Sequence, residues 1–588
     1  MESGWGAMNH LIEVNQITYT HDRQNGETPP ALCGVSLQIA AGEMIAMIGS
    51  NGSGKTTLAR HLNGLLLPTT GTVRVAGLDT SLPDNRQTIL STVGMVFQFP
   101  EDQMVATVVE NDVAFGVENL GLRPAEVRQR VETALREVEM WAWRSRPPHL
   151  LSAGQMQRVA LAGILAMKPR CIVFDEATAM LDPAGRRTVM EIMHRLHQEG
   201  LTIIYITHYM EEAAQAGRVI VLDRGQVALD GSPREVFSDA ERLVKLGLDL
   251  PPAVKAAAVL HEVFPALPQD LLTLDDLLAA LPHAPAGVVP PVAVSQTRPV
   301  EEFEAWIEVS GLSHTYLLDT PFAYQALQEV DMRVAKGGSQ GLIGGTGSGK
   351  STLMQHLNCL FKPFTGRVRV GQFDFNAPEV TVYQVCQMAG LVFQNPEAQF
   401  FEQYAGDEIA YGPRLQGLDK PVLRQRVQWA MEMVGLDFET FKDRLTFTLS
   451  GGEKRKVALA SILALQPEVL LLDEPTAGLD PHSRKELIAH LQALRAQGMT
   501  FVVSSHHMDD LAVLTERLLV LHHGRVEMEG SLGEVFSDAE ALQALGLAPP
   551  PAARIAEKLR QNGWPIPAGV VDLQELKNAL VDMPGGMK

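Results

Sequence analysis

The chain has 588 residues, of which 46% are hydrophobic, and a formal net charge of −20 at pH 7. This length supplies several domains with a sizeable apolar core, so the composition excludes a disordered or fibrous protein. The acidic balance disfavours a large footprint on the phosphate backbone of nucleic acid. The N-terminus lacks the pattern of a signal peptide, and no uninterrupted apolar run reaches the length of a bilayer span. We therefore expect any membrane-spanning part of the function to belong to another chain.

Two glycine-rich motifs, whose lysines stand 295 residues apart, each follow a short apolar run and precede a helical pattern. This strand, loop and helix context is the one that a phosphate loop requires. Backbone N–H groups of such a loop point at phosphate oxygens, its lysine reaches the β- and γ-phosphates, and the next hydroxyl is a ligand for Mg²⁺. The predicted ATP-binding residues are Gly49, Ser50, Asn51, Gly52, Ser53, Gly54, Lys55, Thr56 and Thr57, then Gly344, Gly345, Thr346, Gly347, Ser348, Gly349, Lys350, Ser351 and Thr352.

Other segments recur at about the same interval. Ile12-Glu13-Val14 returns as Ile307-Glu308-Val309, and Thr207-His208 returns as Ser505-His506. A repeat of this length indicates two homologous domains rather than a solenoid. Because short apolar runs alternate with helical patterns within each repeat, we predict an α/β fold with a largely parallel sheet.

The strand signals are interrupted once in each repeat by helical spacing, and each repeat ends in an amphipathic tail. The intervening stretch is rich in Pro and Ala, which is typical of a semi-extended linker. The predicted boundaries are a first domain at 8–282, with a helical subdomain at about 104–158 and a C-terminal extension at about 238–282, a linker at 283–303, and a second domain at 304–588, with a helical subdomain at about 400–456 and an extension at about 537–588.

A pair of carboxylates ends a four-residue apolar run in each repeat, as Asp175-Glu176 and as Asp473-Glu474. Such a run predicts a buried parallel strand, which delivers its acids to the sheet edge where open α/β sheets bind ligands. We expect each Asp to hold Mg²⁺ and each Glu to orient and deprotonate an attacking water.

Together these motifs resemble those of a tandem pair of ATP-binding-cassette (ABC) ATPases, and the resemblance covers nearly the whole chain. Leu151 to Gln155 and Leu449 to Glu453 match the Leu-Ser-Gly-Gly-Gln signature of that family. The family has a RecA-like core, a β-rich subdomain and a helical subdomain in each cassette. Its signature completes the ATP site on the other cassette's phosphate loop, which implies two composite sites. The residues implied to bind ATP from the signatures are Ser152, Gly154, Gln155, Ser450, Gly451, Gly452 and Glu453.

The resemblance also assigns roles to single residues. It implies that Glu176 and Glu474 are the catalytic glutamates, that Gln98 and Gln394 contact Mg²⁺ and the water, and that His208 and His506 contact the γ-phosphate. The implied Mg²⁺ ligands are Thr56, Gln98, Asp175, Ser351, Gln394 and Asp473. Asp182 and Asp480 resemble the loop that communicates between sites.

Two positions depart from the family pattern. Tyr316 matches the aromatic residue that stacks on adenine, but the corresponding residue of the first repeat is His21, whose smaller ring predicts weaker adenine binding. Ala153 replaces a glycine where the backbone should approach phosphate, which predicts slower turnover at the second site.

Within the family, the segments Phe97 to Gln103 and Phe393 to Gln399 resemble the Phe-Gln-x-Pro-Glu-x-Gln segment of energy-coupling factor (ECF) transporters. The tails also resemble the C-terminal dimerisation extensions of that group. This implies an ATPase for vitamin or transition-metal uptake, bound to the cytoplasmic face of the membrane. Its partners would be a transmembrane coupling subunit and a substrate-binding membrane subunit, with ATP and Mg²⁺ as its ligands and no nucleic acid.

Two alternatives remain open. One is the ATPase of a conventional ABC importer, which only family-level motifs distinguish from the ECF group. The other is a soluble tandem ABC protein that acts on ribosomes or DNA. That class usually has a long charged linker, whereas the linker of this acidic chain is rich in Pro and Ala.

Overall fold

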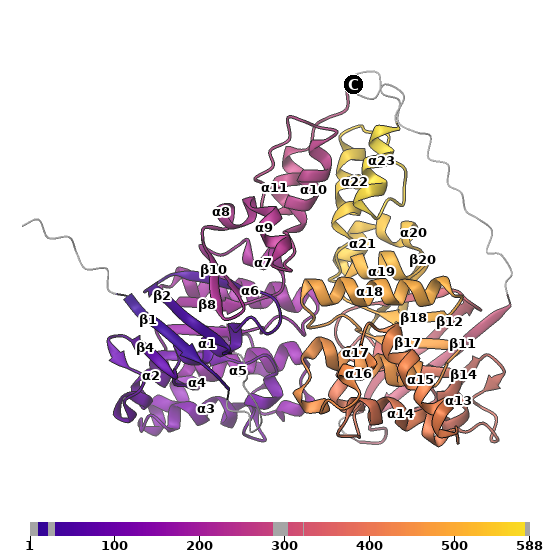
Figure 1. Ribbon diagram of the computed structural model, residues 1–588, viewed down its shortest axis with the longest axis horizontal. Coiled ribbons are helices and arrows are strands. Elements are labelled where there is room, and N and C mark those ends of the chain that lie inside the picture. The colour runs from indigo at the N-terminus through magenta and orange to yellow at the C-terminus, as the bar shows by residue number, and fades with distance from the viewer. Residues whose placement is uncertain (1–9, 22–29, 286–303, 321–322, 583–588) are drawn as a thin grey trace, which may run out of the picture. The chain divides into compact units, whose positions relative to one another are not determined.

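The computed structural model describes residues 10–21, 30–285, 304–320 and 323–582 (Figure 1). The chain divides into two compact units, residues 1–254 and 255–588. Each unit contains a phosphate loop, a mainly parallel sheet and an antiparallel sheet. The predicted α/β fold with two similar domains is therefore confirmed. From residue 286 onwards the predicted linker lies outside the described residues.

The first unit is built on a six-stranded sheet in which β10 runs antiparallel and the other strands run parallel. The parallel strands β3, β7 and β8 are buried at every position, as their continuous apolar runs require. In spatial order the strands are β10 (Gln226–Gly231), β9 (Arg218–Asp223), β3 (Met44–Ile48), β8 (Thr202–Ile206), β7 (Cys171–Asp175) and β6 (Val93–Val96).

A smaller antiparallel sheet shares its core with the main sheet. Its strands are β2 (Leu32–Ala40), β1 (His10–Tyr19), β4 (Thr70–Val75) and β5 (Leu78–Asp79), in that spatial order. The shared core contains Ile12 from β1, Met47 from β3 and Leu58 from α1, so the helix after the phosphate loop belongs to both layers. This packing fixes the direction in which the phosphate loop leaves β3.

Helices complete the first unit. Helices α3, α4 and α5 pack on one another and form a helical subdomain. Helix α4 begins at Pro124 and buries Val127, Val131 and Leu135, the spacing of one helix face. The helices are α1 (Lys55–Leu62), α2 (Arg86–Thr92), α3 (Val109–Glu118), α4 (Pro124–Glu137), α5 (Ala153–Ala166), α6 (Pro183–Gln198), α7 (Met210–Ala213), α8 (Pro233–Ser238) and α9 (Ala240–Lys245).

The second unit repeats both sheets with the same connectivity. The antiparallel sheet has the order β12 (Tyr324–Ala335), β11 (Ala305–Tyr316), β14 (Thr365–Val370) and β15 (Phe373–Asp374). The main sheet has the order β16 (Ala389–Val392), β17 (Val469–Asp473), β18 (Thr500–Ser504), β13 (Ser339–Ile343), β19 (Arg517–His522) and β20 (Arg525–Ser531).

The helices of the second unit follow its strands in the same order as in the first unit. Helices α14, α15 and α17 pack together as the counterpart of α3, α4 and α5. The helices are α12 (Lys350–Leu357), α13 (Val382–Met388), α14 (Ala405–Leu415), α15 (Lys420–Met433), α16 (Phe438–Phe441), α17 (Gly451–Leu463), α18 (Pro481–Ala496), α19 (Met508–Leu514), α20 (Leu532–Ser537), α21 (Ala539–Ala544), α22 (Pro551–Gln561) and α23 (Leu573–Val581).

The segment that ends the first repeat packs within the second unit. It contains most of α10 (Pro252–His261) and all of α11 (Leu274–Ala280), and α11 contacts α22. Trp564 donates from Nε1 to the carbonyl oxygen of Pro282 at 2.8 Å, and its ring meets Phe264 edge to face at 5.1 Å. The two C-terminal extensions therefore share one apolar contact. The precise domain boundaries stay predictions.

Within the described ranges, none of the helices combines the length and the hydropathy needed to cross a bilayer.

Candidate ATP sites

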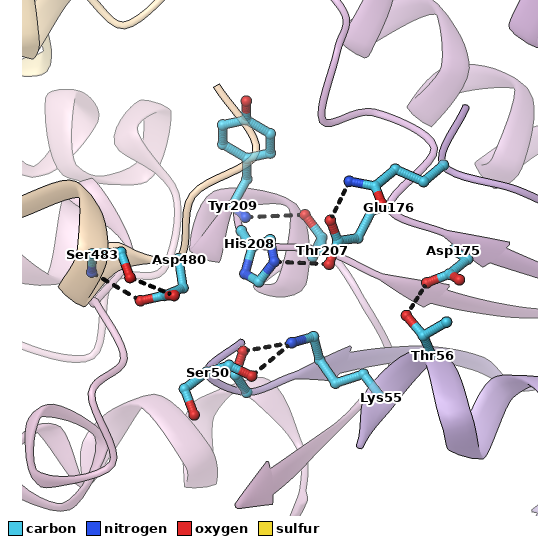
Figure 2. Close-up of polar contacts among 12 residues, drawn as sticks. Ser50, Lys55, Thr56, Asp175, Glu176, Thr207, His208, Tyr209, Asp480 and Ser483 are labelled. Carbon is cyan, nitrogen blue, oxygen red and sulfur yellow. Dashed lines mark hydrogen bonds and ion pairs between the residues drawn. The ribbon is translucent and has the colours of Figure 1, made fainter. Parts of the chain in front are cut away.

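Each phosphate loop curls around its own lysine. Lys55 donates from Nζ to the carbonyl oxygens of Gly49 at 2.8 Å and Ser50 at 3.0 Å, as Figure 2 shows for the Ser50 contact. Lys350 makes the corresponding bonds to Gly344 at 2.7 Å and Gly345 at 3.1 Å. The lysine that is predicted to reach the phosphates is thus held inside the loop in both units.

The turn into α1 requires glycine at its last position. Gly54 has a φ of 102°, and a side chain there would stand 2.6 Å from the carbonyl oxygen of Ala31. Gly349 has a φ of 104° and the same close approach to Ala326. Only glycine adopts this backbone without strain, so the helix begins directly behind the curled loop.

The first unit brings two of its predicted Mg²⁺ ligands together. Thr56 donates from Oγ1 to Oδ1 of Asp175 at 2.9 Å (Figure 2). Burial, together with the neighbouring Glu176, raises the pKa of Asp175 to about 6. In the second unit Asp473 accepts a bond from Ser504 Oγ at 2.6 Å. Buried oxygen ligands of this kind suit Mg²⁺, which would offset the repulsion between the paired acids.

The first predicted catalytic trio is in contact. Oε1 of Glu176 lies 2.8 Å from Nε2 of His208 (Figure 2). Gln98 donates from Nε2 to Oε2 of Glu176 at 2.9 Å. Burial alone would raise the pKa of Glu176, but His208 and Lys55 outweigh it, so the pKa lies below its usual range. The first unit therefore holds a charged carboxylate between two predicted partners.

The second unit holds its glutamate differently. Nε2 of His506 lies 3.1 Å from Oε1 of Glu474, and the backbone N–H of His506 donates to Oε2 at 3.1 Å. Burial raises the pKa of Glu474 to about 7, with Lys350 opposing and Asp473 adding to the rise. The pKa values of the two predicted catalytic bases are thus shifted in opposite directions.

A residue that the sequence reasoning missed lies behind the second site. Arg455 is buried in α17 and donates from Nη1 to the carbonyl oxygen of Gln394 at 2.7 Å and from Nη2 to that of Ala477 at 2.9 Å. Burial lowers its pKa to about 10. The corresponding residue, Gln157, donates to Phe97 O at 3.2 Å. The sequence held no local signal for Arg455, because charged residues stand on both sides of it in the signature helix.

The residues predicted to stack on adenine lie beside the phosphate loops. Tyr316 OH is 3.1 Å from Thr352 Oγ1, and His21 Nε2 is 3.4 Å from Thr57 Oγ1. A second aromatic residue, Tyr324, was missed by the sequence reasoning. It is half exposed and donates to the carbonyl oxygen of Gly347 at 2.8 Å.

Both signatures open a helix through a reciprocal cap. Gln155 N–H donates to Ser152 Oγ at 3.3 Å, and Ser152 N–H donates to Gln155 Oε1 at 3.0 Å. Ser450 and Glu453 repeat this box at the start of α17. The last signature residue of each unit is therefore used for capping. The pairing of each signature with the other phosphate loop stays a prediction, as do the contacts of Gly154, Gly451 and Gly452 with nucleotide.

Comparison with known proteins places these motifs in a family. The family model described as ABC transporter matches residues 32–179 and 327–477. An ABC transporter ATP-binding protein of Caldanaerobacter subterraneus subsp. tengcongensis is 33% identical, over 93% of this chain and 96% of its own length.

Shorter relatives match a stretch as long as one repeat. The energy-coupling factor transporter ATP-binding protein EcfA1 of the same organism is 50% identical, over 46% of this chain and 98% of its own length. The protein of the same name from Symbiobacterium thermophilum is 53% identical, over 46% of this chain and 97% of its own length.

Proposed function

Because the chain belongs to the ABC transporter family and is an ABC-type ATPase, we propose that it is the energy-coupling subunit of an ECF-type importer, bound to the cytoplasmic face of the membrane. The observation that carries this proposal is the 50% identity to an energy-coupling factor ATP-binding protein over 98% of that protein's length. This chain carries two cassettes, whereas the energy-coupling factor relatives each match a stretch as long as one repeat, which supports a fused pair of such ATP-binding proteins.

Both cassettes carry a full set of hydrolytic residues, so two working sites follow. At the first site, Lys55 holds the phosphates, Glu176 takes a proton from the attacking water, and His208 holds Glu176 and the γ-phosphate in register. Lys350, Glu474 and His506 do the same at the second. Each site is completed by the opposite signature, through Ser450, Gly451 and Gly452 at the first site and through Ser152 and Gly154 at the second.

The residues that would hold Mg²⁺ are Thr56, Gln98 and Asp175 at the first site and Ser351, Gln394 and Asp473 at the second. Bound there, the ion would neutralise charge on the β- and γ-phosphate oxygens.

Exposed aromatic residues support a membrane partner for the second cassette. Phe401 is 77% exposed and stacks on Tyr411 with ring centroids 5.8 Å apart. Tyr404 and Phe447, both also exposed, belong to the same subdomain. A patch of large apolar side chains at the surface marks a binding site, and we assign it to a coupling helix of the transmembrane subunit.

The loop that carries Phe401 is held by hydrogen bonds to a carboxylate of the helical subdomain. Glu408 accepts bonds at Oε2 from the backbone N–H groups of Phe401 and Glu402, each at 2.8 Å. Asp112 holds the matching loop of the first cassette through Val105 N–H at 2.7 Å and Ala106 N–H at 2.9 Å. A loop tied to the helical subdomain in this way transmits the movement of that subdomain to whatever binds the loop.

The experiment is to extract the full chain from its native membranes in mild detergent and to identify the membrane proteins that accompany it by mass spectrometry. A multi-span coupling subunit together with a small substrate-binding membrane protein supports the proposal. A pair of conventional permease subunits, or no membrane partner at all, contradicts it. Replacement of Phe401 by Ser should release the partner while ATP hydrolysis continues, and Val581→Ser, at an exposed residue of α23, is the control.

A further inference from the structure

A buried carboxylate in the first unit joins the segment after the catalytic glutamate to the segment that carries the histidine. Oε2 of Glu212 accepts bonds from Thr178 Oγ1 at 2.9 Å and from Thr207 Oγ1 at 2.6 Å. Thr178 follows Glu176 by two residues, and Thr207 directly precedes His208. The side chains of Glu212 and both threonines are 2–4% exposed. One oxygen atom thus connects two loops that lead to the reacting groups.

The second unit has a shorter acid at the matching position, and it binds only one of the two corresponding segments. Oδ2 of Asp510 accepts a bond from Thr476 Oγ1 at 2.6 Å, and its Oδ1 accepts one from Arg484 Nε at 2.9 Å. Ser505, which precedes His506, accepts a bond from the backbone N–H of His507 at 3.0 Å. Thr207 Oγ1 accepts the corresponding bond from Tyr209 at 3.0 Å. The local turn before each helix is therefore the same, whereas the acid differs.

The loops need such a connection because the sheet does not extend to them. Strands β7 and β8 are in register up to the pair of Asp175 and Ile206, and Glu176 and His208 lie beyond that pair. Glu176 has a φ of 51° and Glu474 a φ of 49°, a left-handed backbone that non-glycine residues rarely adopt. A strained backbone of this kind persists only when its surroundings fix it.

We infer that Glu212 and Asp510 are positioning residues for ATP hydrolysis, because each binds a threonine of the segment after the catalytic glutamate and stands in the short helix that follows the catalytic histidine. Glu212 is anchored in turn by Tyr205, whose OH donates to the Glu212 carbonyl oxygen at 2.8 Å. The inference rests on the assigned hydrolytic roles of Glu176 and His208 but not on the identity of the membrane partner.

A positioning role and a purely structural role predict different kinetics. If the carboxylate only stabilised the fold, its removal would lower the melting temperature and affect all variants alike. If it acts by placing the histidine, its removal should lower kcat, leave the KM for ATP nearly unchanged, and have no effect once the histidine is gone. Two changes that act through one contact are not additive, and this distinguishes the two roles.

The test uses the full chain in detergent-free buffer and changes both cassettes together, so that neither site masks the other. Glu212→Ala with Asp510→Ala should lower kcat about 10-fold or more, with KM within about 3-fold. Burial raises the pKa of Glu212, although Arg186 opposes this, so a neutral amide is a close mimic. Glu212→Gln with Asp510→Asn should therefore recover most of the rate. Glu211→Ala, at a neighbouring exposed acid, is the matched control.

The decisive comparison adds the alanine pair to His208→Ala with His506→Ala. We expect no further loss of rate on that background. Three outcomes would overturn the inference. One is a second full loss of rate on the histidine-free background. The others are a kcat of the alanine pair within 2-fold of the unmodified chain, and an effect that is confined to KM. If the alanine pair does not fold, Thr178→Val with Thr476→Val removes the matching donor in each cassette at constant shape and should show the same dependence on histidine. These rates do not depend on whether a membrane partner is captured. A failure of the importer proposal can therefore be distinguished from a failure of this inference.

Discussion

Nε2 of His208 lies 2.8 Å from Oε1 of Glu176, and Nε2 of His506 lies 3.1 Å from Oε1 of Glu474. The two residues of each pair follow the ends of neighbouring parallel strands, β7 with β8 and β17 with β18. Both pairs therefore arise from strand order, which places the two loops at one edge of the sheet. Because the pairing is present in both units, we expect both sites to hydrolyse ATP.

Replacement of either catalytic glutamate tests this expectation. Glu176→Gln and Glu474→Gln should each lower steady-state ATP turnover by about 10²-fold or more, since each removes a positioned acid/base group. Phosphate release by the purified full chain is the measurement. ATP binding should persist in both variants, because the amide keeps the shape of the side chain. If one of the two substitutions leaves hydrolysis unchanged, only the other site turns over.

The adenine contacts of the two sites should differ in strength. His21 offers a smaller ring than Tyr316, so Tyr316→His should weaken binding of a non-hydrolysable ATP analogue at its site about 5-fold, and His21→Tyr should strengthen binding at the other. Isothermal titration of the full chain measures both affinities. Equal affinities in the unmodified chain, or no response to the exchange, would show that these side chains do not stack on the base.

Arg455 offers a prediction about stability. Its buried guanidinium donates hydrogen bonds to the carbonyl oxygens of Gln394 and Ala477. Because Arg455→Ala leaves these acceptors without their donor, it should lower the free energy of unfolding of the second unit by about 2–4 kcal/mol. Arg455→Gln should recover part of this, because Gln157 is the natural residue at the matching position. Urea unfolding followed by tryptophan fluorescence is the measurement, and Arg424→Ala on the exposed face of α15 is the control. Equal stability of Arg455→Ala and the unmodified chain would contradict the prediction.

The buried histidines of the phosphate-loop helices predict a pH dependence. Burial lowers the pKa of His61 and of His356, although each ring makes a bond to a backbone carbonyl that opposes the shift. The folded state therefore favours the neutral ring. The stability contribution is present above the ordinary histidine pKa and is lost as the pH falls through the lowered pKa of the folded state.

The melting temperature of the nucleotide-free chain should accordingly fall as the pH decreases from 7.5 to about 5. His356→Gln should make this fall shallower, because the amide keeps a donor for Thr352 O but does not titrate near neutral pH. His482→Gln, at a histidine whose side chain is 67% exposed, should leave the slope unchanged. Identical slopes for all three proteins would show that protonation of His356 does not contribute.

Much of the fold followed from the sequence because its signals are local. The apolar runs before Asp175 and Asp473, the glycine spacing of the phosphate loops and the internal repeat predicted the parallel sheets and the two domains. The members of the first trio, Gln98, Glu176 and His208, were each predicted from the family resemblance, and the structure places them in contact.

The residues that were missed depend on long-range packing. Glu212 lies in a short helix where a charged residue has no periodic signature, and its partners Thr178 and Thr207 are separate in sequence. Arg455 is one of several charged residues in the signature helix, and only tertiary packing distinguishes it from its partly exposed neighbours. Both catalytic glutamates are buried, and the opposite shifts of their pKa values depend on the charges that the fold brings near them, His208 beside Glu176 and Asp473 beside Glu474.

The contact between the two C-terminal extensions decides where the chain can be divided for biochemical study. Residues 255–285 are covalently continuous with the first repeat but pack with the second, and Trp564, only 9% exposed, donates its indole N–H to Pro282. A fragment that began at residue 304 would lack Phe264 and Pro282 and expose the indole ring, and exposed apolar surface of this kind favours aggregation. A single-repeat fragment of the second half should therefore be supplied with residues 255–285, either fused or as a separate peptide.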